Sequence, residues 1–340
     1  MPDSPTAAIP RLSVVMPVRN AGAHLDAAIE SILRQTFADF ELVLLDDASE
    51  DGSCDRLGDW ARRDPRIRLF RNEASLGLAG SSHFVVERAH APLVARMDAD
   101  DTSRPERLDR QLAIMDAEPE TVLVGTLWEG IDDEGRVIRR CDRSRLLERG
   151  AIPPIAHGSV MFRRDAWLVT GGYRPKCEYW EDIDLFYRLS RLGAIKIIPE
   201  PLYRYRFHSR NSRITVDLRR LEQATERLVR CAAEMEAGRS YEPLLEGPPS
   251  DVSRPARLYA YASHISSAVM GGSRPNLAAI LAHPFVPLCT QAVKVYGEAI
   301  VGTVSPAMAR FMMNQAAKLR DHFARRRLRP DEAITWQFER

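Results

Sequence analysis

Three acidic clusters lie where their carboxylates could act together. MDADD covers residues 97–101, DDASEDGS covers 46–53 and YWEDIDLFYRL covers 179–189. Like charges at this density repel one another unless a cation or water lies among them. Carboxylates can bind a divalent cation that also takes phosphate oxygens, and a carboxylate that stays ionised near neutral pH can act as a general base. These two chemistries are the ones that the clusters offer.

The spacing in MDADD favours two carboxylates on one side of the chain. In an extended segment Asp98 and Asp100 point the same way, with Cα atoms roughly 6.5 Å apart. One could hold Mg²⁺ or Mn²⁺, which leave positions open for phosphate oxygens, while the other accepts hydrogen bonds from a hydroxyl. The alternative is a solvated acidic turn in which Asp101 or Thr102 caps the following helix. Spacing alone leaves both interpretations open.

The other two clusters also have a structural and a functional interpretation. Asp46 and Asp47 could simply end a strand in a turn-forming segment, or one of them could bind a nucleoside N–H or hydroxyl. Glu181 and Asp182 fall at the start of an amphipathic helix, where acids commonly complement the helix dipole. An acid in that place remains ionised near neutral pH, as a general base must be.

The segments around these clusters predict an α/β fold. Short apolar strands are expected at 12–18, 41–46, 67–70 and 92–97, with a helical pattern between the first two. Continuous apolar strands separated by helices indicate a largely parallel sheet covered on both faces. Further along, helices are expected at 104–115 and 181–193, and strands at 121–128, 159–164, 194–199 and 201–208. The polar clusters follow strand ends, where parallel sheets bind ligands.

Composition and length restrict the class of protein. The 340 residues allow one large or two modest domains, and we expect a catalytic domain over 1–215 and a mostly helical region over 216–340. The 28% of charged residues balance to a net +1, which argues against a nucleic-acid partner. Five scattered cysteines and no secretory signal favour a reduced, cytoplasmic protein.

The C-terminal region carries two segments of interest. Residues 274–294 enclose an uncharged stretch with three prolines, which makes a poor membrane-spanning helix and favours a buried helical hairpin over a membrane-surface contact. Residues 319–330 are basic, which suits either a solvated helix face or anionic lipid. The region could be a lid, a contact in a homo-oligomer or a platform at the inner face of the membrane.

Taken in order, the motifs resemble glycosyltransferase family 2, whose members have the GT-A fold. VVMPVRN (14–20) is similar to the opening strand of that family, LLDDASEDGS to its nucleotide loop, MDADD to its metal motif and WEDIDLFYRL to its acidic base motif. HGSVMFRR (157–164), GGYRP (171–175) and PLYRYRFHSRNSR (201–213) are similar to its intervening and closing segments. The resemblance covers about 12–213.

The resemblance implies a nucleotide pocket and a catalytic centre. Asp47 would contact the base of the nucleotide with Pro17 and Asn20 beside it, and Asp98 would face the ribose or the diphosphate.

Asp100 would bind Mn²⁺ or Mg²⁺, and His208 would supply a further metal or diphosphate contact. Asp182 would be the catalytic base, and Glu181 would position the acceptor. One departure concerns the segment after the third strand, where the family often has Arg-Asn and this sequence has Ser82-His83.

The resemblance implies an inverting transfer of a sugar from a nucleotide-diphosphate sugar to a hydroxyl of a growing or lipid-linked glycan. The alternatives are a glycosyltransferase-like protein that binds nucleotide or a partner without turnover, and a sugar nucleotidyltransferase. The latter needs a Gly-rich basic loop after the first strand, and PVRNAGAHL has one glycine. A dinucleotide-dependent dehydrogenase is disfavoured because no GxGxxG follows that strand.

Overall fold

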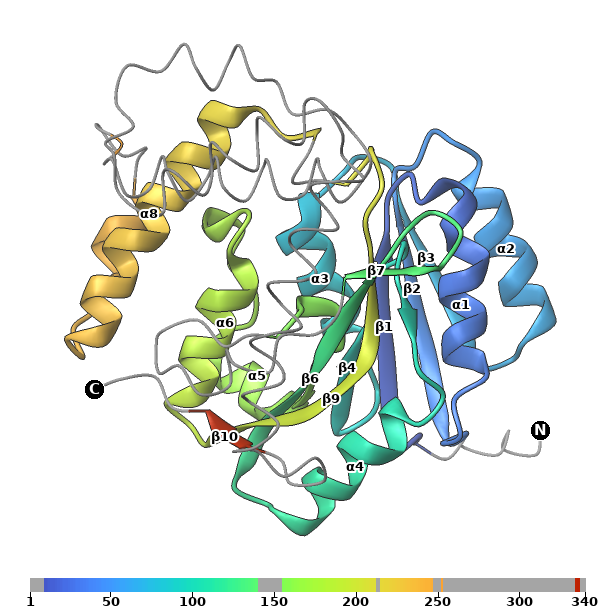
Figure 1. Cartoon of the computed structure of the whole chain (residues 1–340), viewed down its shortest axis with the longest axis horizontal. Helices are drawn as coiled ribbons and strands as arrows, with labels where there is room; N and C mark the ends of the chain where they lie inside the picture. The colour runs from blue at the N-terminus through green and yellow to red at the C-terminus, as the bar shows by residue number, and fades with distance from the viewer. Residues whose placement is uncertain (1–8, 140–154, 212–214, 247–251, 253–333, 337–340) are drawn as a thin grey trace, which may run out of the picture.

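One mixed sheet with helices on both faces organises the chain (Figure 1). The computed structural model describes residues 9–139, 155–211, 215–246, 252 and 334–336. The strands are β1 (Leu12–Val18), β2 (Phe40–Asp47), β3 (Ile67–Asn72), β4 (Leu93–Arg96), β5 (Thr102–Ser103), β6 (Thr121–Ile131), β7 (Val137–Arg139), β8 (Met161–Arg163), β9 (Ala194–Arg206) and β10 (Ile334–Trp336). The α-helices are α1 (Leu25–Leu33), α2 (Ser53–Arg63), α3 (Gly77–Glu87), α4 (Arg107–Ala117), α5 (Arg164–Thr170), α6 (Glu181–Ser190) and α8 (Leu218–Glu236). Short 3₁₀ helices are η1 (Gly22–His24), η3 (His157–Ser159), η4 (Pro175–Cys177) and η5 (Glu242–Leu245).

The sheet order is β10-β9-β6-β8-β4-β1-β2-β3. The half formed by β4, β1, β2 and β3 is parallel throughout, as predicted from its apolar strands. β8 runs antiparallel to both β4 and β6, while β6 and β9 are parallel to each other. The expected α/β architecture with a mainly parallel, mixed sheet is therefore confirmed.

Alternate side chains of each strand fill two separate cores. In β1, Val14 and Met16 face a core with α1, α2 and α4, whereas Val15 faces a core with α3, α5 and α6. This division follows from the two-residue period of a strand. Burial on both faces explains why the strands are continuous apolar runs in the sequence. The carboxyl ends of β1, β2 and β4 are thereby held at one edge of the sheet.

The two strands expected at 194–199 and 201–208 are one strand, β9. Pro199 and Pro201 fall at the point where the pairing with β6 shifts register, between Thr126 and Leu127. A proline cannot donate a ladder hydrogen bond and is tolerated at such an irregularity. The prolines therefore mark a bulge within a continuous strand, where the sequence suggested a break.

The described residues after 215 lie against α6 and β9. α8 lies alongside α6 in Figure 1, and the two share an apolar cluster. β10 pairs antiparallel with β9. Among the residues that the structure describes, no helix is both long and apolar enough to cross a bilayer. The segments 274–294 and 319–330 lie outside the described residues.

Candidate active site

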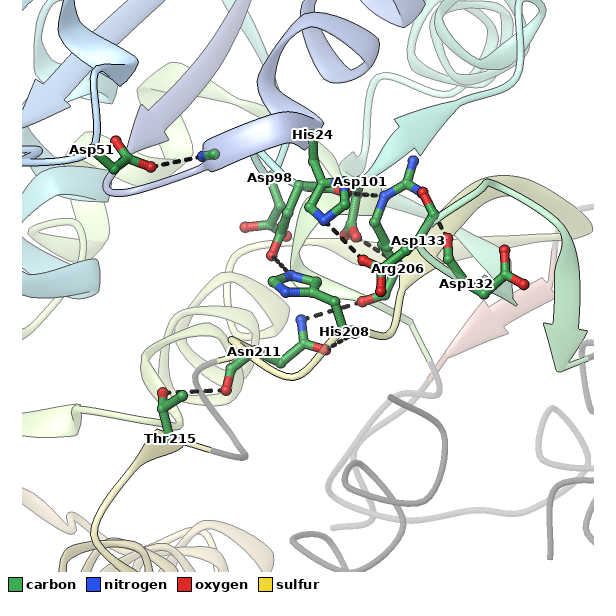
Figure 2. Close-up of polar contacts among 12 residues, drawn as sticks. His24, Asp51, Asp98, Asp101, Asp132, Asp133, Arg206, His208, Asn211 and Thr215 are labelled. Atoms are coloured by element: carbon green, nitrogen blue, oxygen red, sulfur yellow. Dashed lines mark hydrogen bonds and ion pairs between the residues drawn. The ribbon is translucent and has the colours of Figure 1, made fainter. Parts of the chain in front are cut away.

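The loops after β1 and β2 are fastened to each other. Asn20 has a left-handed backbone (φ 51°), and its Oδ1 accepts a hydrogen bond from the Glu50 N–H at 2.8 Å. The Asn20 N–H donates to Ser49 Oγ at 3.0 Å. The Gly22 N–H donates to Asp51 Oδ2 at 2.8 Å, as Figure 2 shows. These contacts define the loop predicted to hold the nucleotide.

Asp47 ends β2 as a buried carboxylate, 2% exposed. It accepts hydrogen bonds from Asn72 Nδ2 (2.8 Å), Ser75 Oγ (2.7 Å) and the Leu76 N–H (2.9 Å). Burial alone would raise the pKa of Asp47, but these hydrogen bonds outweigh it and hold the pKa below its usual value. Pro17 lies half-buried in the neighbouring β1. The ionised Asp47 therefore fixes the segment after β3 beside the predicted nucleotide pocket.

The carboxylates of MDADD have separate partners because the chain turns. β4 ends at Arg96 and residues 99–100 form a turn, so the assumption of an extended segment is wrong. Asp98 Oδ1 pairs with Arg96 Nη1 at 2.5 Å, and Arg96 is 1% exposed. Asp100 Oδ2 lies 3.0 Å from His208 Nε2. The turn thus directs the Asp98 carboxylate to the buried Arg96 guanidinium and the Asp100 carboxylate to the His208 imidazole, which follows β9.

Asp101 is not a helix cap. It is 1% exposed, accepts from the Arg206 N–H (2.7 Å) and accepts from the Tyr203 hydroxyl (2.6 Å). Burial and the neighbouring carboxylates raise the pKa of Asp101 well above its usual value. The cap position of α4 is Glu106, and Thr102 begins β5. The capping interpretation of this segment is therefore wrong, because both residues belong to the contact with β9.

Arg206 connects three segments around this turn. Its Nε donates to the Asp100 carbonyl at 2.8 Å, and its Nη1 donates to the carbonyls of Asp132 (2.6 Å) and Asp133 (2.8 Å). Figure 2 shows Arg206 with Asp101, Asp132 and Asp133 around it. The buried guanidinium thereby joins the MDADD turn and β9 to the hairpin between β6 and β7.

His24, from η1, lies against His208. The two ring centroids are 4.9 Å apart, and His24 Nε2 lies 3.1 Å from Asp133 Oδ1. Burial, together with the nearby Arg206 and His208, holds the pKa of His24 below its usual value, so its ring is predominantly neutral at pH 7. The nucleotide loop therefore ends in contact with the predicted metal ligand.

Asp100 and His208 fit a divalent cation. His208 Nε2 faces the carboxylate, and its buried Nδ1 has no hydrogen-bond partner in the described part of the chain. With the proton on Nδ1, Nε2 presents its lone pair toward Asp100. Among the described residues, no group of three or more His, Cys, Asp or Glu side chains is arranged to hold a metal. A cation here would need phosphate or water oxygens to complete its coordination.

The predicted acidic pair begins α6. Glu181 is the first helical residue and is buried, at 3% exposure, whereas Asp182 is half-buried. Asp182 Oδ1 accepts a hydrogen bond from the Ile183 N–H at 2.8 Å. The placement of both acids in the first turn of a helix is confirmed.

His157 lies between Tyr173 and the acidic pair. His157 Nε2 lies 2.8 Å from the Tyr173 hydroxyl, and its Nδ1 is 3.8 Å from Glu181 Oε1. Burial and then Arg96 hold the pKa of His157 well below its usual value, so the contact with Glu181 joins a neutral ring to a carboxylate.

Tyr173 senses the charge of both acidic clusters. Burial is the main cause that raises the pKa of Tyr173, and Arg96 opposes it. The charges of Glu181, Asp182 and Asp98 raise it further.

Arg96 and Tyr203 are among the site residues that the sequence-based prediction lacks. Arg96 is a charged residue inside an apolar strand, and such a residue is buried only with a partner. Tyr203 lies in an aromatic segment whose pattern also fits an ordinary half-buried strand, yet it contacts Asp98 (3.2 Å) as well as Asp101. For Arg96, the signal in the sequence was an isolated charged residue within an apolar strand.

Ser82 and His83, the departure from the family pattern, lie in α3. Ser82 is buried, and the His83 ring lies 4.9 Å from that of Trp167 on α5. A Cβ on Gly172 would lie 2.7 Å from His83 Nδ1. His83 therefore packs between α5 and the glycine pair that precedes Tyr173.

Comparisons with known proteins identify relatives of this chain. The model of the family described as glycosyl transferase family 2 matches residues 13–168. The putative glycosyltransferase EpsE of Bacillus subtilis is 33% identical over 205 residues, which cover 58% of this chain and 73% of EpsE. The O-antigen biosynthesis glycosyltransferase WbnJ of Escherichia coli is 30% identical over 212 residues, which cover 59% of this chain and 81% of WbnJ.

A solved structure is similar in fold. The mannosyltransferase PcManGT from Pyrobaculum calidifontis, in complex with GDP-Man and Mn²⁺, aligns with a TM-score of 0.54 at 18% identity. The alignment covers 94% of this chain and 89% of PcManGT. The chain belongs to glycosyltransferase family 2 and is a glycosyltransferase with the GT-A fold.

Proposed function

We propose that this protein transfers a sugar from a nucleotide-diphosphate sugar to a hydroxyl of a growing or lipid-linked glycan, by one displacement that inverts the anomeric carbon. The observation that carries the proposal is the approach of Asp100 Oδ2 and His208 Nε2 to 3.0 Å beside the Asp98–Arg96 pair. This arrangement offers a candidate cation site next to the loops predicted to bind the nucleotide.

The comparisons support a nucleotide-sugar donor and a glycan product. PcManGT was solved with GDP-Man, and WbnJ is an O-antigen biosynthesis enzyme. In this chain Pro17, Asn20 and Asp47 would contact the nucleoside, and Asp98 would contact the ribose or the diphosphate. Asp98 is partly buried, and its pairing with the buried Arg96 compensates the solvation that both charged groups lose.

Asp100 and His208 would hold Mn²⁺ or Mg²⁺ with the diphosphate. A carboxylate and an imidazole together suit Mn²⁺, while Mg²⁺ prefers oxygen ligands alone. When bound, the cation neutralises charge that develops on the departing diphosphate. PcManGT, solved with Mn²⁺, supports a divalent cofactor. His24 and Arg206 would keep the two ligands in place through their contacts with His208 and the Asp100 carbonyl.

Asp182 would accept the proton of the acceptor hydroxyl as the hydroxyl oxygen attacks the anomeric carbon. Its half-buried position at the start of α6 leaves it accessible to an acceptor, and the positive end of a helix dipole favours a negative charge there. Glu181, buried against His157, would orient the acceptor and the first turn of the helix. The displacement needs no covalent sugar–enzyme intermediate.

The test measures nucleoside-diphosphate release from a panel of donors with Mn²⁺, for the parent and for Asp182→Asn. We expect the variant to lose turnover and to keep nucleotide affinity. Asp165→Asn is the matched control, because Asp165 also lies in the first turn of a helix and accepts from the next N–H, at 2.7 Å. Normal turnover by Asp182→Asn would exclude Asp182 as the base. Nucleotide binding without release from any donor would favour the binding-only alternative.

The proposed acceptor also suggests where the protein acts. We place it in the cytoplasm, in contact with the inner face of the membrane where lipid-linked acceptors lie. The separation into a catalytic domain over 1–215 and a C-terminal region over 216–340 stays a prediction, as does a homo-oligomer. Co-sedimentation with vesicles containing anionic lipid tests the membrane contact, and failure to sediment at low salt would exclude it.

A further inference from the structure

The described part of the C-terminal region shares a core with the helix that carries the acidic pair. α8 and η5 bury apolar side chains against α6 and η4, as the position of α8 beside α6 in Figure 1 illustrates. The buried members of this cluster are Cys177, Trp180, Tyr187, Leu228, Cys231, Met235, Tyr241 and Leu245. This core is distinct from the two that flank the sheet.

Trp180 brings this core directly to the acidic pair. It precedes Glu181 in sequence, is 1% exposed, and packs in the cluster shared with α8 and η5. Its carbonyl accepts the Asp184 N–H at 3.1 Å, which closes the first turn of α6. The point at which the chain enters the helix is therefore buried against the C-terminal segment.

Asp184 supplies a polar contact at the same place. It is fully buried on α6, and its Oδ2 accepts from Arg188 Nε at 3.0 Å. Its Oδ1 accepts from the Tyr241 hydroxyl at 2.7 Å. Burial and the Asp184 charge raise the pKa of Tyr241, so the hydroxyl keeps its proton and donates it. Tyr241, which follows α8, thereby contacts the first turns of α6.

Arg174 extends this contact to the neighbour of the acidic pair. Its Nη1 lies 3.5 Å from Asp184 Oδ1, its Nη2 lies 2.7 Å from Glu242 Oε1, and its guanidinium lies over the Tyr241 ring at 5.8 Å. The hydroxyl of the preceding residue, Tyr173, lies 2.8 Å from His157 Nε2, and His157 Nδ1 lies 3.8 Å from Glu181 Oε1. Tyr173 therefore reaches the acidic pair through His157, while Arg174 contacts the C-terminal segment.

We infer that Tyr241, acting through Asp184, is a positioning residue for Asp182, so that the segment 218–246 is part of the catalytic apparatus. The inference rests on the proposed function, in which Asp182 is the base. Without the Tyr241 hydroxyl, Asp184 Oδ1 loses its donor at 2.7 Å and keeps the Arg174 guanidinium 3.5 Å away. Arg174 then moves toward the carboxylate, and both Tyr173 and the first turn of α6 shift with it. Small misplacements of a reacting group lower the rate far more than they lower ground-state binding.

The test compares Tyr241→Phe with Tyr187→Phe. Tyr187 is a matched control, because its hydroxyl also joins α6 to the C-terminal segment. The Tyr187 hydroxyl donates to the Met235 carbonyl at 3.2 Å, whereas the Tyr241 hydroxyl donates to the Asp184 carboxylate. We expect Tyr241→Phe to lower kcat about tenfold to a hundredfold with the donor KM unchanged. Tyr187→Phe should keep kcat within about twofold of the parent, although it also loses a hydrogen bond between α6 and the C-terminal segment. The loss of stability should be larger for Tyr241→Phe, because its hydroxyl bonds a buried carboxylate.

Hydrogen exchange gives a readout that does not depend on turnover. Amides at the start of α6 should exchange faster in Tyr241→Phe than in Tyr187→Phe, because only the former loosens the Tyr241–Asp184 contact. Equal kcat in the two variants would overturn the inference, and so would equal exchange at the start of α6. Normal turnover by Asp182→Asn would instead refute the proposed function, whatever the exchange data show.

Discussion

Gly158 lies where a side chain would displace two groups of the site. A Cβ on Gly158 would lie 1.9 Å from the Tyr203 hydroxyl oxygen, 2.5 Å from its Cζ and 2.6 Å from Asp98 Oδ2. Tyr203 is fully buried, and its hydroxyl donates to Asp101 at 2.6 Å, so the ring has little room to move. The Gly158→Ala substitution must therefore break polar contacts as well as overpack the core.

The magnitude follows from these two effects. Overpacking a dense core costs about 1–3 kcal/mol. Losing a hydrogen bond to a charged group costs about 1.5–3 kcal/mol, and the Tyr203 hydroxyl bonds the acidic turn. We expect the free energy of unfolding of Gly158→Ala to fall by about 3 kcal/mol or more. Because Asp98 shifts with Tyr203, nucleotide affinity should fall as well.

Chemical denaturation and calorimetric titration of a nucleoside diphosphate with Mn²⁺ measure the two effects. Gly58→Ala is the control, since the nearest atom to its Cβ is Arg62 Nη1 at an ordinary 3.5 Å, and alanine in α2 should stabilise the helix by about 1 kcal/mol. The reasoning is refuted if Gly158→Ala unfolds at the denaturant concentration of the parent and binds nucleotide with parental affinity.

Three further substitutions probe the site. Asp100→Ala and His208→Ala should each weaken nucleotide binding in the presence of Mn²⁺ by about tenfold or more. Neither variant should change nucleotide binding without metal. An equal dependence on Mn²⁺ in variant and parent would contradict the assignment of these residues as metal ligands. Asp47→Asn should change the pH dependence of stability. The pKa of Asp47 in the folded protein lies below the ordinary value of 3.8. The ionised carboxylate therefore stabilises the fold above that pH. This contribution is lost as the pH falls through the lower pKa of the folded state. The stability difference between parent and Asp47→Asn should be constant above about pH 5 and shrink below it. A difference that persists unchanged at about pH 2 would contradict the role of its hydrogen bonds.

Local patterns were sufficient to predict the elements that carry the site. The strand expected at 12–18 is β1, with the same bounds, because an unbroken apolar run between polar turns is typical of a buried strand. The helix expected from 181 begins at Glu181, because apolar residues recur at helical spacing after it. The order of strand, polar cluster and helix then predicts that the clusters gather at one sheet edge.

The partners of the carboxylates could not be predicted in this way. Asp101 contacts Tyr203 and Arg206, about a hundred residues further along the chain, and no local pattern specifies that pairing. The direction of a carboxylate in a turn depends on which distant donor reaches it. The assumption of an extended MDADD segment failed for this reason, since the turn satisfies each carboxylate separately.

The three acids of MDADD coexist because each has a different environment. Asp98 is paired with Arg96. Burial alone would lower the pKa of Arg96, but the charge of Asp98 outweighs burial and raises this pKa. Asp101 is buried and holds its proton more readily, so it adds less negative charge to the turn. Asp100 alone of the three combines a half-buried carboxylate with a neighbouring imidazole, at His208. The unpaired negative charge at this turn is therefore centred on Asp100, which is the reason that we propose Asp100, and neither Asp98 nor Asp101, as the carboxylate that would bind a divalent cation.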